Sequence, residues 1–221
     1  MEGVAVPTSR SYRDACGIAR ALDVVGERWA LLVVRELLLG PRRFSDLRHA
    51  LVGASSNLVT DRLRELEARG VVSRRKLAPP AGSWVYELTE WGRKLEPILL
   101  ELGGWGIEVP HPPEPTTLSA ASVLIFLRGA AHPDPAAPEA VYRVELDDQV
   151  WTVRTEAGRV QVLPGEPTAP DAAIRTNPKT FNALLDDPNA LDALLADGHL
   201  VVSGDLSALR RLARSTVGWA A

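Results

Sequence analysis

A polar stretch in the first half of the chain, followed closely by three basic residues, is the part of the sequence best equipped for chemistry. Residues 55–70 read SSNLVTDRLRELEARG, and Arg74, Arg75 and Lys76 come directly after VVS. Hydroxyl and amide groups exchange hydrogen bonds with base edges, and basic side chains bind phosphates. These residue types together indicate contact with a nucleic-acid duplex.

The apolar spacing predicts a helix over 55–69 whose two sides differ. Ser55 is a suitable N-cap and Gly70 a suitable stop. The predicted buried side consists of Leu58, Val59, Leu63 and Leu66. The opposite side consists of Ser56, Asn57, Thr60, Asp61 and Arg64. We expect Asn57 to present its amide to a base edge, and Arg64 to reach a phosphate or a guanine.

The elements around this helix complete a recognisable order. Helices are predicted within 14–39 and 44–51, strands at 71–77 and 84–88, and a helix over 90–102 bent at Pro97. Three helices followed by a β-hairpin form a winged helix-turn-helix. We expect the hairpin residues Arg74, Arg75 and Lys76 to lie along flanking phosphates. Arg42 and Arg43 precede a helix whose N-terminal amides also favour anions. Asp61 is expected to pair with Arg62 or Arg64, or to accept from a cytosine.

The charge distribution agrees with a local DNA contact, although the net charge of the chain is −3. Residues 1–110 hold 16 basic and 14 acidic residues, which gives +2, whereas residues 111–221 hold 9 and 14, which gives −5. Within 40–76 there are 9 basic and 4 acidic residues, or +5. Basic charge is therefore concentrated around the predicted reading helix.

A second domain follows a proline-rich linker. The linker, VPHPPEPTT at 109–117, separates a DNA-binding and dimerisation domain at 1–108 from a domain at 118–221. In the second domain, strands are predicted at 123–127, 141–146, 150–155, 159–163, 172–175 and 199–202. Helices are predicted at 177–185, 188–195 and from 205 to about 215. A run of strands followed by helices is typical of the α+β class.

Several other classes of protein are disfavoured by the sequence. It contains no G-x-S-x-G, Walker-type or H-E-x-x-H motif, so we expect neither an enzyme nor a cofactor. The single Cys16 excludes an internal disulfide, and the four scattered histidines argue against a metal site. Neither a signal peptide nor a membrane-spanning run is apparent, and we therefore expect a cytoplasmic protein with no membrane partner.

Residues 14–106 closely resemble the HxlR-type winged-helix transcriptional regulators. The resemblance is carried by CGIARALDVVGERWALLVVRELLLGPRRFSDLRHAL, SSNLVTDRLRELEARGVVSRR and YELTEWGRKLEPILLELGGWG. It implies a homodimer, joined through the N-terminal and post-wing helices, that binds an inverted-repeat operator. It further implies DNA contacts from Ser55, Ser56, Asn57, Thr60 and Arg64. Ser56 and Asn57 replace the family's frequent Pro and Lys, and Asp61 its Gln, so the operator sequence does not carry over.

Cys16 lies where many of these regulators have a cysteine, and some of them use it as a thiol redox sensor. Two interpretations are open for this chain. Cys16 is either a small buried residue of the first helix or a reactive thiolate. The second interpretation requires a cationic neighbour, for which Arg13 and Arg20 are near in sequence.

Residues 141–215 resemble a sterol-carrier-protein-type domain. The resemblance is carried by VYRVELDDQVWTVRTEAGRVQV, DAAIRTNPKTFNALL and HLVVSGDLSALRRLAR, without the family's usual opening helices. It implies an apolar cavity between a sheet and its covering helices. The candidate lining residues are Phe126, Trp151, Phe181, Leu184 and Leu195. The alternative is that these side chains fill a solid core.

Taken together, these features predict a homodimeric regulator, a repressor by its resemblance, that binds double-stranded DNA. Its second domain is expected either to sense a small apolar or lipid-like ligand or to contact the partner subunit. Two alternatives remain. One is a redox regulator acting through Cys16, with a structural second domain. The other is a lipid-binding protein whose winged helix contacts another protein.

Overall fold

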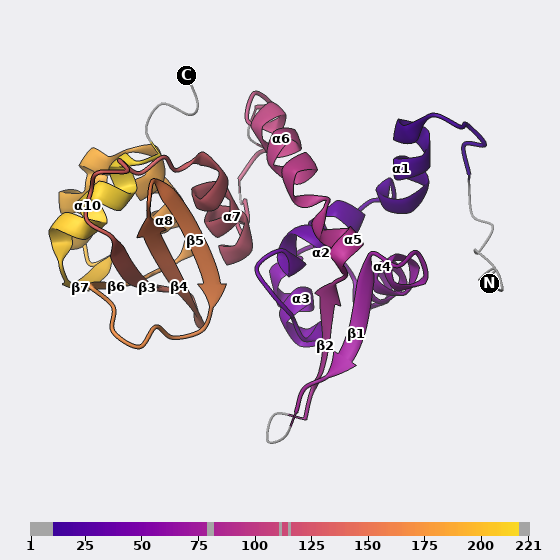
Figure 1. The fold of residues 1–221 in the computed structure, drawn as a ribbon, viewed down its shortest axis with the longest axis horizontal. Coiled ribbons are helices and arrows are strands. Elements are labelled where there is room, and N and C mark those ends of the chain that lie inside the picture. The colour runs from indigo at the N-terminus through magenta and orange to yellow at the C-terminus, as the bar shows by residue number, and fades with distance from the viewer. Residues whose placement is uncertain (1–10, 79–81, 111, 115, 217–221) are drawn as a thin grey trace. The chain divides into compact units, whose positions relative to one another are not determined.

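The computed structural model describes residues 11–78, 82–110, 112–114 and 116–216 (Figure 1). Its contacts divide the chain into two compact units, Met1–Leu102 and Gly103–Ala221. The boundary falls within a helix that ends shortly before the proline-rich segment. His111 and Pro115 of that segment lie outside the described residues.

The first unit is a group of helices followed by a two-stranded antiparallel hairpin. Its elements are α1 (Gly17–Val25), α2 (Ala30–Leu37), α3 (Phe44–Ala50), α4 (Ser56–Ala68), β1 (Val72–Lys76), β2 (Trp84–Leu88), α5 (Glu90–Arg93) and the first part of α6 (Glu96–Gly106). The core joins α2, α3, α4 and the base of the hairpin through Val33, Val34, Leu37, Leu47, Leu51, Val59, Leu63, Leu66, Val72 and Leu88. This order is the winged helix-turn-helix that the sequence predicts.

The passage from α4 into the hairpin is fixed by Gly70. Its φ of +74° lies in the left-handed region, which glycine adopts without strain. Val71 N donates to Leu66 O at 2.9 Å, and the Thr89 hydroxyl donates to the carbonyl of Gly70 at 2.7 Å. Both ends of the hairpin are therefore tied to the end of α4, and its direction relative to that helix is set.

One helix prediction in this unit is wrong. Instead of a single bent helix over 90–102, the chain forms α5 and α6, with a break at Lys94 and Leu95. Pro97 is the second residue of α6, and its nitrogen has no hydrogen to donate to the carbonyl of Arg93. The proline therefore separates two helices and does not bend one.

The second unit is a five-stranded sheet in the order β5-β4-β3-β6-β7, in which β3 and β6 are parallel and the other neighbours are antiparallel. Its elements are α7 (Ala120–Ala130), β3 (Ala140–Leu146), β4 (Gln149–Glu156), β5 (Arg159–Pro164), β6 (Ala172–Thr176), α8 (Pro178–Asp186), η1 (Pro188–Ala190), α9 (Leu191–Ala196), β7 (Val201–Gly204) and α10 (Leu206–Arg214).

Alternation along β3 gives this sheet two different faces. Tyr142, Val144 and Leu146 are buried, whereas Arg143 and Glu145 between them are half-buried and form an ion pair at 2.7 Å. Helix α7 packs on β5 and α8, and α10 packs on β6 and α8. A helix-covered apolar face and a polar face with ion pairs make the unit α+β, as predicted.

The strand predicted at 123–127 is wrong, because these residues lie inside α7. Ser119 caps this helix, accepting a hydrogen bond from Ser122 N at 3.1 Å. Val123, Leu124 and Leu127 are all almost completely buried. A short apolar run that is buried on several sides lacks the periodicity that separates strand from helix. The opening helices usual in sterol-carrier-protein-type domains were expected to be absent here, but one helix, α7, precedes the sheet.

Candidate nucleic-acid interface

Helix α4 has the two-sided character that its sequence predicts. Ser55 caps it, accepting a hydrogen bond from Leu58 N at 3.2 Å. Val59, Leu63 and Leu66 are buried in the core of the first unit. The exposed residues on the other side are Ser56, Asn57, Asp61 and Arg64, with Thr60 half-buried beside them.

Within this polar side, the side chains differ in their internal partners. The Thr60 hydroxyl donates to the carbonyl of Ser56 at 2.8 Å, so its hydrogen is used within the helix. Arg64 is 76% exposed and lies 4.0 Å from Asp61, which gives Asp61 one of its two expected partners. The Asn57 amide is exposed and makes no hydrogen bond to any part of the chain that the structure describes. Asn57 and Arg64 therefore offer the groups that base and phosphate contacts need.

The other expected partner of Asp61, Arg62, has a different role. Its Nη1 lies 2.6 Å from Glu65 and 3.6 Å from Glu27, and only 14% of its side chain is exposed. Glu27 belongs to the turn between α1 and α2. Arg62 therefore connects α4 to the segment that follows α1.

The hairpin distributes its three predicted basic residues over two faces. Directly paired residues on antiparallel strands share a face, and Arg74 pairs with Tyr86, Arg75 with Val85, and Lys76 with Trp84. Arg74 and Lys76 therefore share one face with the two aromatic rings. Arg75 lies on the other face, where its Nε donates to Glu87 at 2.9 Å.

Arg42 and Arg43, next to the hairpin, have unlike surroundings. The backbone of Arg42 pairs with that of Tyr86 through two hydrogen bonds, of 2.9 and 2.8 Å. Burial lowers the pKa of its guanidinium, and the charges of Glu36 and Asp46 oppose that shift. Arg43 is exposed at the N-cap of α3, where its backbone N donates to Asp46 at 3.2 Å. Of the two, Arg43 is the more accessible to a phosphate.

Residues 24–112 match the family model described as HxlR-like helix-turn-helix. The uncharacterized HTH-type transcriptional regulator YvaP of Bacillus subtilis (strain 168) is 39% identical over 93 residues, which cover 42% of this chain and 86% of YvaP. The chain belongs to the HxlR-like helix-turn-helix family. It is accordingly a transcriptional regulator of the HxlR type.

Other proteins and a second family are also similar to this HxlR-type regulator. The uncharacterized regulator YybR of the same bacterium is 35% identical over 94 residues, covering 42% of this chain and 75% of YybR. A solved structure, "Redox regulator HypR in its oxidized form", is 34% identical, covers 44% of this chain and all of that one, and superposes with a TM-score of 0.41. Residues 124–215 match the SCP-2 sterol transfer family, which confirms the second resemblance.

The HxlR-type unit also exposes apolar side chains on the two helices that the family resemblance assigns to the dimer. On α1, Ile18 is 73% exposed and Leu22 is also exposed. On α6, Ile98 is 56% exposed and Leu102 is exposed as well. Cys16 is exposed at the N-cap position of α1, which contradicts the interpretation of this residue as buried.

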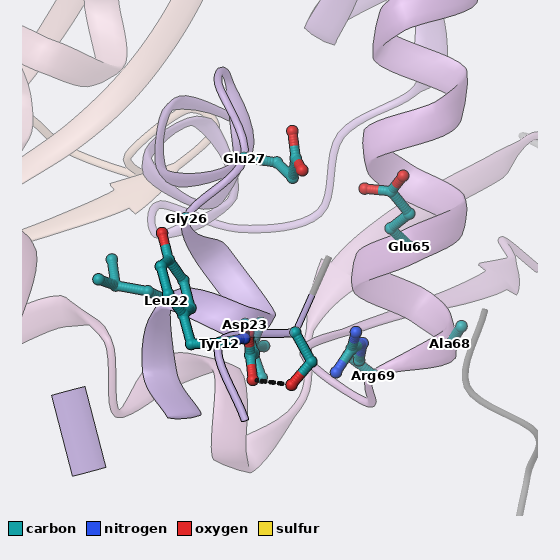
Figure 2. A pocket seen from close by; sticks show the side chains of 10 residues that line it. Tyr12, Leu22, Asp23, Gly26, Glu27, Glu65, Ala68 and Arg69 are labelled. Carbon is teal, nitrogen blue, oxygen red and sulfur yellow. Dashed lines mark hydrogen bonds between the residues drawn. The ribbon is translucent and has the colours of Figure 1, made fainter. Parts of the chain in front are cut away.

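A cavity of about 590 Å³ lies in the first unit, beside α1 and the C-terminal half of α4 (Figure 2). Asp23 accepts hydrogen bonds from the Ser11 hydroxyl at 2.8 Å and from Tyr12 N at 3.0 Å, which ties the segment before α1 to that helix. Glu27 and Glu65, the two carboxylates that Arg62 contacts, also line this cavity. The cavity therefore adjoins the connection between the end of α1 and α4.

In the SCP-2-type unit, the five predicted ligand-lining residues divide into two groups. Trp151, Phe181 and Leu184 are buried, with at most 2% of each exposed, whereas Phe126 and Leu195 are half-buried. None of the five lines the cavity of about 360 Å³ found in this unit. That cavity lies between residues 132–138, residues 155–158 at the end of β4 and the following turn, and α10, and its lining includes Tyr142, Thr155 and Arg211.

Neither a metal site nor a membrane span emerges from the described residues. Over this part of the chain, no group of three or more His, Cys, Asp or Glu side chains is placed to hold a metal ion. None of the helices found there is both long enough and apolar enough to cross a bilayer.

Sequence reasoning missed several residues that shape the site. Trp84 and Tyr86 lie beside Arg74, and their spacing in W-V-Y opposite R-R-K is a signal that the hairpin register makes readable. Arg62 carries no such signal, because its partner Glu27 is distant in sequence and is brought near only by the fold.

Proposed function

We propose that this regulator binds an inverted-repeat DNA operator as a homodimer and represses transcription. The observation that carries the proposal is the exposed polar side of α4, with Asn57 and Arg64 available, next to a hairpin that offers Arg74 and Lys76. Ser55, Ser56 and Thr60 complete the surface of α4, and Arg43 adds a cation at the start of α3. Of the remaining predicted contacts, Arg42 is half-buried, and Arg75 lies on the opposite face of the hairpin, where it pairs with Glu87.

Exposed apolar residues on α1 and α6 support the dimer. In the proposed dimer, two copies of α4 reach successive major grooves on one side of the duplex, about 34 Å apart. A change of a few ångströms in this spacing is then enough to lose the register between the two half-sites.

A gel-shift titration at two salt concentrations tests the proposal. We expect wild-type protein to bind a duplex selected from a random library, and the affinity to fall steeply as salt rises, because bound phosphates release counterions. Asn57→Ala should reduce discrimination between the selected duplex and a scrambled one by about 1–3 kcal/mol. Absence of salt-dependent binding would instead favour the alternative of a lipid-binding protein whose winged helix contacts another protein.

We propose in addition that the SCP-2-type unit binds a small, largely apolar molecule and thereby alters the dimer geometry. The family match supports this, and a cavity of about 360 Å³ is available. A coupling free energy of about 1–3 kcal/mol would change operator affinity several-fold to hundred-fold. Operator titrations with and without a long-chain fatty acid test the idea. It fails if a saturating amount of a bound fatty acid leaves the affinity unchanged.

A second candidate for the sensing step is Cys16, and its exposure at the start of α1 favours it. In this case an oxidant should release the operator from wild-type protein and not from Cys16→Ser. If both proteins respond alike, Cys16 is not the sensor.

A further inference from the structure

The hairpin carries an arginine stacked on an aromatic side chain. The guanidinium carbon of Arg74 lies 4.4 Å from the ring centroid of Trp84 and 5.8 Å from that of Tyr86. These distances are within the range of attraction between a cation and an aromatic face. Trp84 is 50% exposed, so the stack lies on the surface of the hairpin.

The contact with Trp84 leaves the hydrogen-bond donors of the Arg74 guanidinium available. Attraction to an aromatic ring does not use the five N–H groups of a guanidinium in hydrogen bonds, so they stay available to an anion. A side chain held in this way loses less conformational freedom when it binds a phosphate than a freely rotating one. Trp84 can therefore order Arg74 without occupying its donors.

Arg74 and its neighbour in sequence, Arg75, differ in whether a carboxylate neutralises their charge. Arg75 lies on the opposite face and is neutralised by Glu87 at 2.9 Å. In the described chain, neither Arg74 nor Lys76 forms an ion pair with a carboxylate. Uncompensated positive charge is thus confined to the face that carries Trp84.

The base of this face is anchored to another part of the unit. Arg42 N donates to Tyr86 O at 2.9 Å, and Tyr86 N donates to Arg42 O at 2.8 Å. These bonds attach β2, which carries Trp84, to the segment before α3. The stack is therefore held from both strands and from outside the hairpin.

We propose that Trp84 is a positioning residue for DNA binding, that it holds Arg74 for a phosphate contact, and that Arg75 stabilises the hairpin without contacting DNA. The inference rests on the proposed function, because it specifies which hairpin residues bind the duplex. It replaces the uniform row of three basic contacts with one ordered arginine, one lysine and one internal ion pair.

The experiment uses the full chain and a labelled duplex of mixed sequence, titrated by fluorescence anisotropy at several salt concentrations. Arg74→Ala should weaken binding and lower the slope of log affinity against log salt by about one per protomer. Trp84→Ala should weaken binding several-fold, and Trp84→Phe should restore most of it. Arg75→Gln, the matched control, should leave both affinity and slope unchanged. Thermal unfolding of each variant verifies that the fold is intact.

A double-mutant cycle separates positioning from a general structural effect. If Trp84 acts through Arg74, Trp84→Ala has no further effect in the Arg74→Ala background. An equal loss in both backgrounds overturns the positioning role, as does wild-type affinity in Trp84→Ala. A slope for Arg75→Gln as low as that for Arg74→Ala overturns the assignment of Arg75.

The same titrations distinguish a wrong assignment of the hairpin residues from a wrong proposed function. If Trp84→Ala binds normally while Arg64→Ala still weakens binding, α4 binds DNA and only the hairpin assignment is wrong. If the wild-type protein shows no salt-dependent binding, the proposed function and this inference are both rejected.

Discussion

Whether a basic side chain is available to a phosphate depends on whether the fold places a carboxylate beside it. Arg62, Arg64 and Arg75 belong to one basic segment of the sequence, yet Arg62 and Arg75 are held by carboxylates at 2.6 and 2.9 Å. Arg64 is 4.0 Å from its nearest carboxylate and largely exposed. A sequence shows where positive charge is concentrated, but internal neutralisation depends on contacts such as that between Arg75 and Glu87, which the strand register creates.

Replacing Arg64 should weaken DNA binding more than replacing another arginine of the same helix region. Arg69 provides the matched control, because it lies at the end of α4 and lines the cavity beside α1. We expect Arg64→Ala to cost about 1–3 kcal/mol of binding free energy and to reduce the salt slope by about one per protomer. Arg69→Ala should change both much less. Equal effects in anisotropy titrations would show that net charge alone is responsible.

A pH-dependent contribution to stability is expected from Asp205, the N-cap of α10. Its carboxylate accepts hydrogen bonds from the Ser207 hydroxyl at 2.6 Å and from the backbone N of Ser207 and Ala208 at 2.8 and 3.2 Å. These bonds, chiefly that from the Ser207 side chain, lower its pKa. A lowered folded-state pKa stabilises the protein above the unfolded value of about 3.9, and this is lost as pH falls through the folded value.

Asp205→Ala should therefore lower the melting temperature most near neutral pH, and the difference from wild type should shrink below about pH 4. Thermal unfolding followed by circular dichroism at a series of pH values measures this. Asp148→Ala removes an exposed turn carboxylate and serves as the control. A difference that stays constant down to pH 3 would show that the carboxylate charge is not responsible.

At the scale of secondary-structure elements, local signals predicted most of the fold. Ser55 caps α4 as expected, and Thr89 and Asn177 cap the helices that begin near residues 90 and 177. Ala157 and Gly158, which join the strands predicted at 150–155 and 159–163, both have positive φ, as a tight turn requires. The failures occur where local signals are ambiguous: α7 is apolar on several sides, so periodicity could not distinguish it from a strand.

The sequence likewise predicted part of the candidate site. The polar side of α4 follows from helical spacing, since Val59, Leu63 and Leu66 fix which side is buried. The stacking of Arg74 on Trp84 and the link from Arg62 to Glu27 depend on strand register and tertiary packing, which single-sequence patterns do not specify.

Close packing of α5 on the base of the hairpin gives a stability prediction for Gly92. A Cβ at this position would meet the carbonyl oxygen of Val71 and lie 3.3 Å from Leu88 Cδ2. Gly92→Ala should therefore destabilise the first unit by about 1–3 kcal/mol. Gly17→Ala is the control, because no described atom lies within 4 Å of its added Cβ. Urea unfolding that gives equal midpoints for the two variants would contradict this account of the α5 contact.

For the molecule as a whole, the two units differ in chemistry as well as in fold. The basic excess lies in the half that carries the winged helix-turn-helix, while the acidic half forms the SCP-2-type unit. Acidic charge in the second unit disfavours a DNA contact there. DNA binding is therefore expected from the first unit, and under the proposed function a ligand of the second unit acts through the geometry of the dimer.

The proposed dimer gives the last prediction, which concerns the exposed apolar residues of α1 and α6. Ile18 and Ile98 are 73% and 56% exposed, and burying an isoleucine contributes about 1.5–3 kcal/mol. Because each substitution occurs twice in a symmetric dimer, Ile18→Lys or Ile98→Lys should weaken association roughly a hundredfold or more. Light scattering after gel filtration should show monomers at concentrations where wild type is dimeric. Val201→Lys, at an exposed apolar position of β7, should leave the dimer intact. If both isoleucine variants remain dimeric, these helices do not form the interface.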